Sequence, residues 1–265
     1  KTWKGDQYWK LGGGATVWDT FVYDPKTNLV YFGTGNGLAW AQEARSPGGG
    51  DNLFVSSIVA LNADTGQYAW HYQETPGDEW DYDNTNPIML ADLKFPDGAK
   101  HVAMQASKNG FFYVLDRKTG QLISAKNFTF VNWASHIDMK TGRPVVTQAA
   151  DWYSSPKNVY PSWSGGHTWN PMSYSAKTHL VYIPVIDLSA IWVDLQHNGG
   201  RVKYLDGFFT VNGIYPDDTY DAGGLKGLFG PLPDLQSLKA TRKVNLVREL
   251  LRAWDPVAQK IVWEH

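Results

Sequence analysis

The sequence of 265 residues contains no cysteine, which excludes a disulfide scaffold and a thiolate metal site within this chain. It also lacks a basic block: 24 Lys and Arg stand against 26 Asp and Glu, giving a formal net charge of −2. This balance argues against nucleic acid or an anionic membrane surface as the main partner.

Long apolar runs are missing as well. Even the stretch "HLVYIPVIDLSAIWVDL" is interrupted by Asp187 and Asp194, so no segment is typical of a membrane span. No signal peptide is visible, and the first residue is Lys1. We therefore expect that a leader has been removed or that the sequence is a piece of a longer chain.

Aromatic residues and glycine are abundant, with 13 Trp, 14 Tyr and 26 Gly. They occur in short runs with β-branched residues, and Gly, Asn and Asp separate the runs. This pattern predicts an all-β protein, and the 43% hydrophobic content is sufficient for a substantial core in one domain.

Hairpin signals recur along the chain. Residues 23–36 predict a turn at 25–28 followed by a strand, residues 56–73 predict two strands joined by a turn, and residues 101–128 predict three strands. The first turn of this triple falls at Asn109-Gly110, since Asn-Gly between apolar runs is a strong hairpin signal. We expect meanders of antiparallel strands.

Two self-similar patterns indicate a repeat. Residues 23–33 ("YDPKTNLVYFG") match residues 174–184 ("YSAKTHLVYIP"). Residues 60–70 ("ALNADTGQYAW") match residues 253–263, and a degenerate copy occupies residues 114–124. In this motif the polar turn is tight and the indole packs between neighbouring sheets. Such units are typical of β-propeller blades.

The region of about 187–252 is less regular, and we interpret it as an insertion between blades. It is either a lid over a pocket or a surface loop. A short helix is predicted over residues 243–251 ("KVNLVRELL"), where apolar side chains share one face.

The stretch "TPGDEWDYDN" at residues 75–84 places four acidic side chains around one tryptophan. A bound cation or a carboxylate that acts as a base would explain this charge. A solvated acidic loop is the alternative, because charge runs usually lie on wet surface.

The repeated motif, Ala-x-Asp/Asn-x-x-Thr-Gly-x-x-x-Trp, resembles the tryptophan-docking motif of quinoprotein alcohol dehydrogenases. The resemblance covers nearly the whole chain, from "GDQYWKLGGGATVWD" to "IVWEH". It implies an eight-bladed propeller that holds pyrroloquinoline quinone (PQQ) on its axis beside a metal ion. It also implies a periplasmic enzyme that passes electrons to a cytochrome or ubiquinone.

The resemblance assigns roles to particular residues. It makes Asp81 the catalytic base and a metal ligand, Asn36 a second metal ligand, and Trp40 part of the substrate cavity. It implies quinone contacts by a further set of side chains: Thr16, Trp18, Lys108, Thr168 and Trp169. A tricyclic cofactor needs a flat aromatic surface, which Trp18 would offer, and Lys108 would stabilise charge on the quinone oxygens.

Asp83, two residues after Asp81, resembles the pattern of lanthanide-using members of the family. An additional anionic oxygen suits a cation of higher charge density, so the expected metal is Ca²⁺ or a lanthanide ion, with Asp83 as a ligand. The alternative is a turn-capping aspartate. A helix–loop–helix calcium site fits poorly, because Asn86 and Asp92 stand where that loop needs Gly and Glu.

Each of these residues also has an ordinary structural explanation. Asn36 could occupy a left-handed turn, Lys108 could be a solvated charge at a hairpin tip, and Trp18 and Trp40 could be packing residues. Their joint order and spacing favour the functional interpretation.

The sequence departs from the family in lacking its adjacent cysteine pair and its glutamate metal ligand, both of which lie upstream of the matched region. We expect residues 1–265 to be an incomplete PQQ-binding propeller domain that has only the central blades. Alone it would bind the quinone weakly or not at all, and no haem motif occurs in it.

The expected function is oxidation of a small alcohol to an aldehyde or ketone by hydride transfer to metal-bound PQQ. A non-catalytic propeller scaffold for outer-membrane protein assembly is the alternative, although it would have no reason to retain Asn36, Asp81 and Lys108. A carbohydrate-binding propeller would explain the tryptophans but not the acidic cluster.

Overall fold

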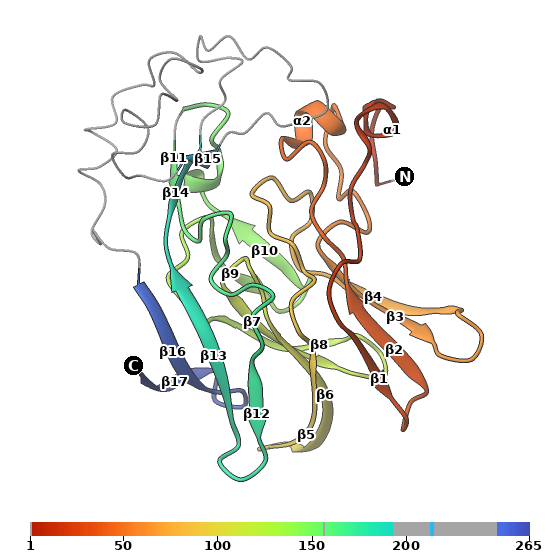
Figure 1. Ribbon diagram of the computed structural model, residues 1–265, viewed down its shortest axis with the longest axis vertical. Coiled ribbons are helices and arrows are strands. Elements are labelled where there is room, and N and C mark those ends of the chain that lie inside the picture. The colour runs from red at the N-terminus through yellow and green to blue at the C-terminus, as the bar shows by residue number, and fades with distance from the viewer. Residues whose placement is uncertain (1, 156, 193–212, 215–247) are drawn as a thin grey trace.

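The computed structural model describes residues 2–155, 157–192, 213–214 and 248–265. Strands predominate in these ranges, and they include three sheets of four antiparallel strands each (Figure 1). The first sheet contains β1 (Phe21–Asp24), β2 (Leu29–Gly33), β3 (Ser57–Asn62) and β4 (Tyr68–Gln73). The second contains β5 (Met89–Phe95), β6 (Gly98–Ala106), β7 (Phe111–Asp116) and β8 (Leu122–Asn127). The third contains β12 (Ser173–Ser175), β13 (Leu180–Asp187), β16 (Arg248–Asp255) and β17 (Lys260–Glu264).

Smaller elements connect these sheets. They are the hairpin β9 (Ala134–Asp138) and β10 (Arg143–Val146), and a sheet of β11 (Lys157–Val159), β14 (Ala190–Trp192) and β15 (Gly213–Ile214). The helices are α1 (Gln7–Leu11), α2 (Gln42–Arg45) and the 3₁₀ turn η1 (Gln148–Ala150). None of the helices in the described ranges is long and apolar enough to cross a membrane.

The strands of each four-stranded sheet are hydrogen-bonded in chain order, as in a blade, so the predicted all-β class and the meanders are confirmed. One turn chemistry recurs within them. The side chains of Asn62, Asp116 and Asp255 each accept two backbone N–H groups of the turn that follows, at 2.8–3.1 Å. The repeated Asp or Asn of the sequence motif therefore closes the tight turn.

The docking role predicted for the motif tryptophan is visible at the contact between the first two sheets. A Cβ atom added to Gly120 would lie 2.5 Å from the Trp70 ring, so this contact admits only glycine. The φ of Gly120 is +74°, which also favours glycine. Trp70 of the first sheet therefore packs directly on the turn of the second.

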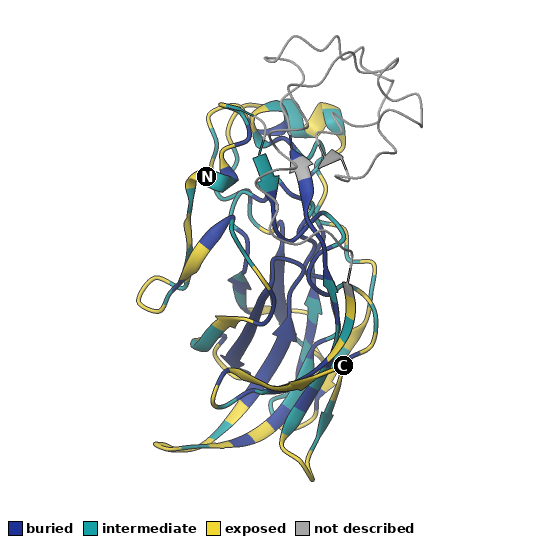
Figure 2. Ribbon diagram, turned by 90° about the vertical axis from the view of Figure 1, so that its left-hand side faces the viewer, coloured by how far each residue is buried: buried dark blue, intermediate teal, exposed yellow. Residues whose placement is uncertain are grey.

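The β5–β8 sheet lies between the other two sheets and is buried on both faces (Figures 1 and 2). Phe111 and Tyr113 of β7 pack into a core shared with the first sheet, and Phe112 and Val114 into a core shared with the third. Alternate residues of a strand point to opposite faces, so one strand supplies both cores.

Two predictions about the irregular region are wrong. Strand β13 pairs with β16 from Val181–Trp254 to Asp187–Arg248, so both strands belong to one sheet. The region of about 187–252 therefore interrupts a blade between its second and third strands and does not lie between blades. Residues 248–251 of the predicted helix belong to strand β16, and the rest of that helix lies outside the described residues. From residue 248 on, pairing with β13 decides the conformation, so the apolar pattern of residues 243–251 does not produce a helix there.

Candidate functional site

The acidic stretch at residues 75–84 joins β4 to β5, and most of it is buried, so the solvated-loop alternative is wrong. Asp78 is buried, and its Oδ1 accepts the backbone N–H groups of Trp80 and Tyr82, each at 3.1 Å. Burial raises the pKa of Asp78, and the nearby charge of Arg45 opposes that rise. Asp78 thus organises the backbone that carries the next two aspartates.

Arg45, at the end of α2, is the residue that sequence reasoning missed most clearly. Its side chain has 0% exposure and donates to the backbone oxygens of Ala39, Trp40 and Asp78 and to Asn52 Oδ1. Burial lowers its pKa, but an arginine remains charged in proteins. One buried cation therefore ties three loops together around the acidic stretch, and no local sequence pattern signals it.

The centre of the site is a buried cluster of Lys108, Asp81 and Asp83. Lys108 Nζ lies 3.0 Å from Asp81 Oδ2 and 2.8 Å from Asp83 Oδ2. The exposed fractions of Lys108 and Asp83 are 5% and 6%, so Lys108 is not a solvated hairpin-tip charge. Because Lys108 lies in the turn between β6 and β7, this contact joins the second sheet to the acidic loop.

Asp83 also connects the cluster to the N-terminal part of the chain. Its Oδ1 accepts the backbone N–H of Asn36 at 2.8 Å and the indole N–H of Trp18 at 3.5 Å. The structure therefore brings together five of the residues that the resemblance selects: Trp18, Asn36, Asp81, Asp83 and Lys108. Their functional roles remain predictions.

The electrostatics of this cluster favour proton exchange near neutral pH. Burial raises the pKa of Asp81 to about 7, Lys108 opposes the rise, and Asp83 adds to it. Burial also disfavours the charge of Lys108, but the two carboxylates outweigh it and raise the pKa of the lysine. The φ of Asp81 is 61°, a left-handed conformation that costs a non-glycine residue about 1–2 kcal/mol.

The flat aromatic surface expected at Trp18 is present, and it is open to solvent. Trp18 is 47% exposed, and its N–H points to Asp83. The Thr16 side chain is exposed, and the Thr16 carbonyl accepts the N–H of Gly35 at 2.9 Å. Both residues precede β1, and the Thr16–Gly35 hydrogen bond holds this segment beside the residues after β2, which include Asn36.

Trp40 belongs to a cluster of tryptophan rings. It is half-buried, its ring centroid lies 5.8 Å from that of Trp192, and Trp152 also packs on Trp192. Nearby, Tyr153 donates to Glu79 Oε1 at 2.8 Å. Sequence reasoning assigned no role to Glu79 or Tyr153.

Thr168 and Trp169 are only loosely connected to the cluster. Gly166 donates its N–H to the Lys108 carbonyl at 2.9 Å, and a Cβ atom on Gly165 would lie 2.7 Å from the Lys108 Cα. This loop therefore covers Lys108. Trp169 is 58% exposed, and within the described ranges no hydrogen bond joins Thr168 or Trp169 to the two carboxylates.

No group of three or more His, Cys, Asp or Glu side chains with the arrangement of a metal site occurs among the described residues. The Lys108 cluster contributes two carboxylates, and the side-chain amide of Asn36 is the further oxygen ligand that the resemblance selects.

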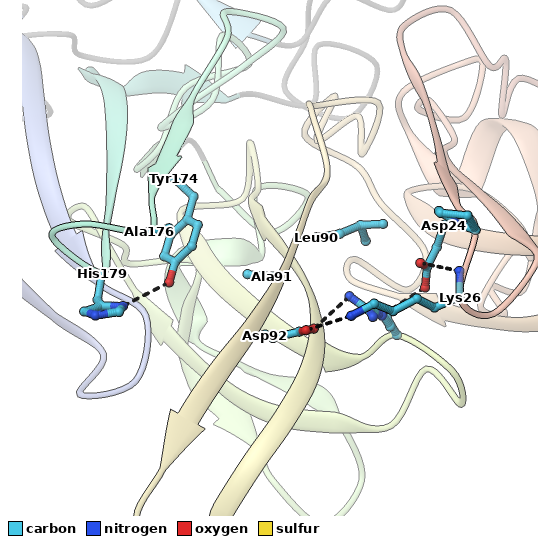
Figure 3. Close-up of a pocket in the computed structure, with 10 residues that line it drawn as sticks. Asp24, Lys26, Leu90, Ala91, Asp92, Tyr174, Ala176 and His179 are labelled. Carbon is cyan, nitrogen blue, oxygen red and sulfur yellow. Dashed lines mark hydrogen bonds and ion pairs between the residues drawn. The ribbon is translucent and has the colours of Figure 1, made fainter.

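A hollow of about 490 Å³ lies at the other end of the strands from the Lys108 cluster, and the charged groups that line it pair with one another (Figure 3). Arg117 is buried and lies 2.9 Å from Asp24 and 3.1 Å from Asp92. His101 and Lys26 also contact Asp92 and hold its pKa down at about 2. The charges of Asp24, Lys26, Asp92 and Arg117 are thus paired with one another. We therefore interpret this network as a structural contact between the first two sheets.

We expect Asp24→Asn to lower the free energy of unfolding by about 1.5–3 kcal/mol, because Arg117 loses a charged, buried partner. Catalytic parameters should stay unchanged, since the site lies at the other end of the strands. Urea unfolding of the protein that carries this chain measures the loss. A loss below about 0.5 kcal/mol would show that the pair is not a structural contact.

Comparisons with known proteins agree with this fold. Residues 1–131 match the family described as glucose/ethanol/alcohol dehydrogenase, beta-propeller domain. The chain is therefore similar to the quinoprotein alcohol dehydrogenases over its whole length. It is 46% identical over 264 residues to quinohemoprotein alcohol dehydrogenase ADH IIB of Pseudomonas putida, covering 100% of this chain and 35% of the relative.

Solved structures give the same result. The chain matches quinohemoprotein alcohol dehydrogenase ADHIIG of Pseudomonas putida with a TM-score of 0.82 and 42% identity, over 100% of this chain and 37% of that one. It also matches a europium-containing methanol dehydrogenase with a TM-score of 0.77 and 32% identity, over 100% of this chain and 41% of that one. The chain thus spans about a third of the length of the curated relatives it matches.

Proposed function

We propose that the protein containing this chain is a quinoprotein alcohol dehydrogenase that oxidises an alcohol to an aldehyde or ketone with PQQ and a bound metal ion. The observation that carries the proposal is the buried contact of Lys108 with Asp81 and Asp83, beside the open indole of Trp18. A scaffold protein would have no need to bury two carboxylates and a lysine at a strained backbone position.

The residues present fit a planar, anionic quinone. The Trp18 indole offers a flat, accessible face, and its hydrogen bond to Asp83 fixes the plane of the ring. Lys108 is a buried cation beside that face, and the exposed Thr16 hydroxyl is a further donor. We assign Trp18, Lys108 and Thr16 to hold the quinone, with Thr168 and Trp169 as further wall residues.

The residues also fit a hard cation. Asp81 and Asp83 would provide carboxylate oxygens, and we assign the side-chain amide oxygen of Asn36, whose backbone N–H already contacts Asp83, as a neutral one; this is the ligand chemistry of Ca²⁺ and lanthanide ions. In the present structure Lys108 contacts both carboxylates and offsets part of their negative charge. When bound, the quinone would accept the hydride, and the cation would polarise the quinone carbonyl as a Lewis acid.

Asp81 is the residue of this chain that we propose to take the hydroxyl proton of the alcohol. Lys108 Nζ fixes the position of its carboxylate at 3.0 Å, and a bound cation would favour the ionised form that accepts a proton. The alcohol would lie beside the ring of Trp40, which the Trp192 contact orients. The buried loop around Asp78 holds the backbone that carries this carboxylate.

Activity supplies the test of this function. The purified full-length protein should carry a quinone visible by absorbance and reduce a dye when ethanol is added. Absence of both quinone and alcohol-dependent reduction, with metal and PQQ supplied, would favour the non-catalytic scaffold. We further propose a periplasmic location and a cytochrome or ubiquinone as electron acceptor, which fractionation and acceptor assays would test.

The second carboxylate leads to a prediction about the metal. Asp83→Ala should lower the ratio of activity with lanthanum to activity with calcium by about tenfold or more, because a trivalent ion loses an anionic ligand. The europium in a matched structure makes this comparison worthwhile. Asp83→Asn is the matched control, since it keeps an oxygen ligand without the charge and should give an intermediate ratio. An unchanged ratio in both variants would reject Asp83 as a metal ligand.

A further inference from the structure

Behind the Lys108 cluster lies a carboxyl group that the proposed chemistry does not use. Glu74 directly follows β4 and precedes the acidic stretch, and its side chain is 1% exposed. Burial raises its pKa well above the usual range of a glutamate. A fully buried acid away from the reacting atoms needs an explanation, because burying a carboxyl group is costly unless it is hydrogen-bonded.

The partners of this carboxyl group are the sequence neighbours of the site residues. Asn84, next to Asp83, donates its side-chain N–H to Glu74 Oε2 at 2.7 Å when its amide takes the orientation that satisfies both of its ends. Ser107, next to Lys108, is the other side-chain partner of the same carboxyl group. One buried group thus touches both loops that meet in the cluster.

The backbone of Glu74 is bound to the loop that carries Lys108. Its carbonyl accepts from the side chain of Asn109, which follows Lys108, at 3.4 Å. Asn84 is itself held from the other side, since Gln105 Nε2 donates to the Asn84 and Asn86 carbonyls at 3.2 and 2.5 Å. Neither loop can shift against the other without breaking buried hydrogen bonds.

We propose that Glu74 is a positioning residue, whose buried carboxyl group between Asn84 and Ser107 fixes the distance from Lys108 to Asp81 and Asp83. The proposal rests on the proposed function for its effect on turnover, but the geometric role stands without it. A neutral acid suits this role, because Asn84 pairs only with Oε2, Oε1 has no hydrogen-bond partner among the described residues, and a buried carboxylate paired on one oxygen only would be costly.

The central experiment compares Glu74→Ala with Glu74→Gln in the full-length protein. Glu74→Ala removes the link between the loops and should lower kcat by about 10–100-fold with a smaller change in KM, because a small misplacement of catalytic groups is costly. Glu74→Gln keeps a neutral group of the same shape and should restore most of the rate. Equal losses in both variants, or no loss in Glu74→Ala, would overturn the proposal.

Two controls separate positioning from simple destabilisation. Asp24→Asn destabilises the protein at the far end of the strands and should leave kcat and KM unchanged. Ser107→Ala removes the second partner of Glu74 and should lower kcat in the same direction, which keeps the test available if Glu74→Ala does not fold. A wild-type rate in Ser107→Ala would count against the proposal.

A structural readout needs no activity. In a crystal structure of Glu74→Ala, the Lys108 Nζ–Asp83 Oδ2 distance of 2.8 Å should lengthen, and in Glu74→Gln it should not. An unchanged distance in Glu74→Ala overturns the proposal. If the wild-type protein shows no alcohol oxidation, the proposed function fails, but this distance still tests Glu74.

A pH measurement checks the protonation that the role requires. A raised pKa in the folded state means that the folded protein holds its proton longer, so stability is highest below the usual glutamate pKa of about 4.3 and falls as pH rises above it. The other ionisable groups facing Glu74 are the buried Tyr72 and Tyr113, whose pKa values burial raises above their usual range. Glu74→Gln should therefore flatten the fall of the melting temperature as pH rises above about 4.3. An unchanged slope would contradict a neutral Glu74.

Discussion

Asp81→Asn in the full-length protein is expected to lower kcat by about 10²–10⁴-fold, which is the usual contribution of a general base. The amide has nearly the same shape as the carboxylate and can still accept from Lys108 Nζ, so the loop should keep its conformation. It cannot take the proton of an alcohol. Bound quinone, measured by absorbance, should therefore be largely retained while dye reduction is lost.

Asp92→Asn is a suitable control for this variant, because Asp92 is an exposed aspartate at the other end of the strands. Its kcat should equal that of the wild type. If Asp81→Asn turned over alcohol at a wild-type rate, the proton would be leaving by another group, and the assignment of Asp81 as the base would have to be abandoned.

Arg45→Met is expected to lower the free energy of unfolding by about 3–5 kcal/mol, because it removes the cation beside the buried Asp78. The backbone oxygens of Ala39, Trp40 and Asp78 would lose their donor at the same time. Total stabilities of about 5–15 kcal/mol make this a large fraction. Urea or thermal unfolding of the variant measures the effect.

The chain provides a matched arginine for comparison. Arg143 forms a bidentate pair with Asp51 at 2.6 and 3.0 Å but is about half exposed. Arg143→Met should therefore cost less than about 1 kcal/mol. Similar losses in the two variants would mean that burial does not distinguish them, and that Arg45 does not stabilise the acidic loop as the contacts suggest.

The parts of the fold that follow from the sequence are those set by neighbouring residues. The turns after Asn62 and Asp116 are closed by the side chains that open them, so the hairpins could be located from a few residues. The pairing of β13 with β16 depends instead on residues that lie about sixty positions apart, such as Asp187 and Arg248. No local pattern records such a partner, and the apolar face of residues 243–251 was consequently predicted as helix.

The residues of the site can also be divided into those that could be predicted from the sequence and those that could not. The resemblance selected Asp81, Asp83 and Lys108, and the structure places them in contact. Residue chemistry alone favoured a solvated Lys108, because a lysine at a hairpin tip is usually exposed. Arg45 and Glu74 could not be predicted, since each acts through groups that are distant in sequence or through its neighbours' backbone. Burial, which decides their importance, is a property of the folded chain.

Lys108 belongs to the β6–β7 turn of the second sheet, whereas Asn36 follows β2 of the first sheet. Both contact Asp83, so the cluster joins two neighbouring blades. A sliding motion of one blade against the next would therefore pull the reactive groups apart while leaving each sheet intact. The site is therefore competent only when the blades are aligned, and the Trp70–Gly120 contact helps to hold that alignment.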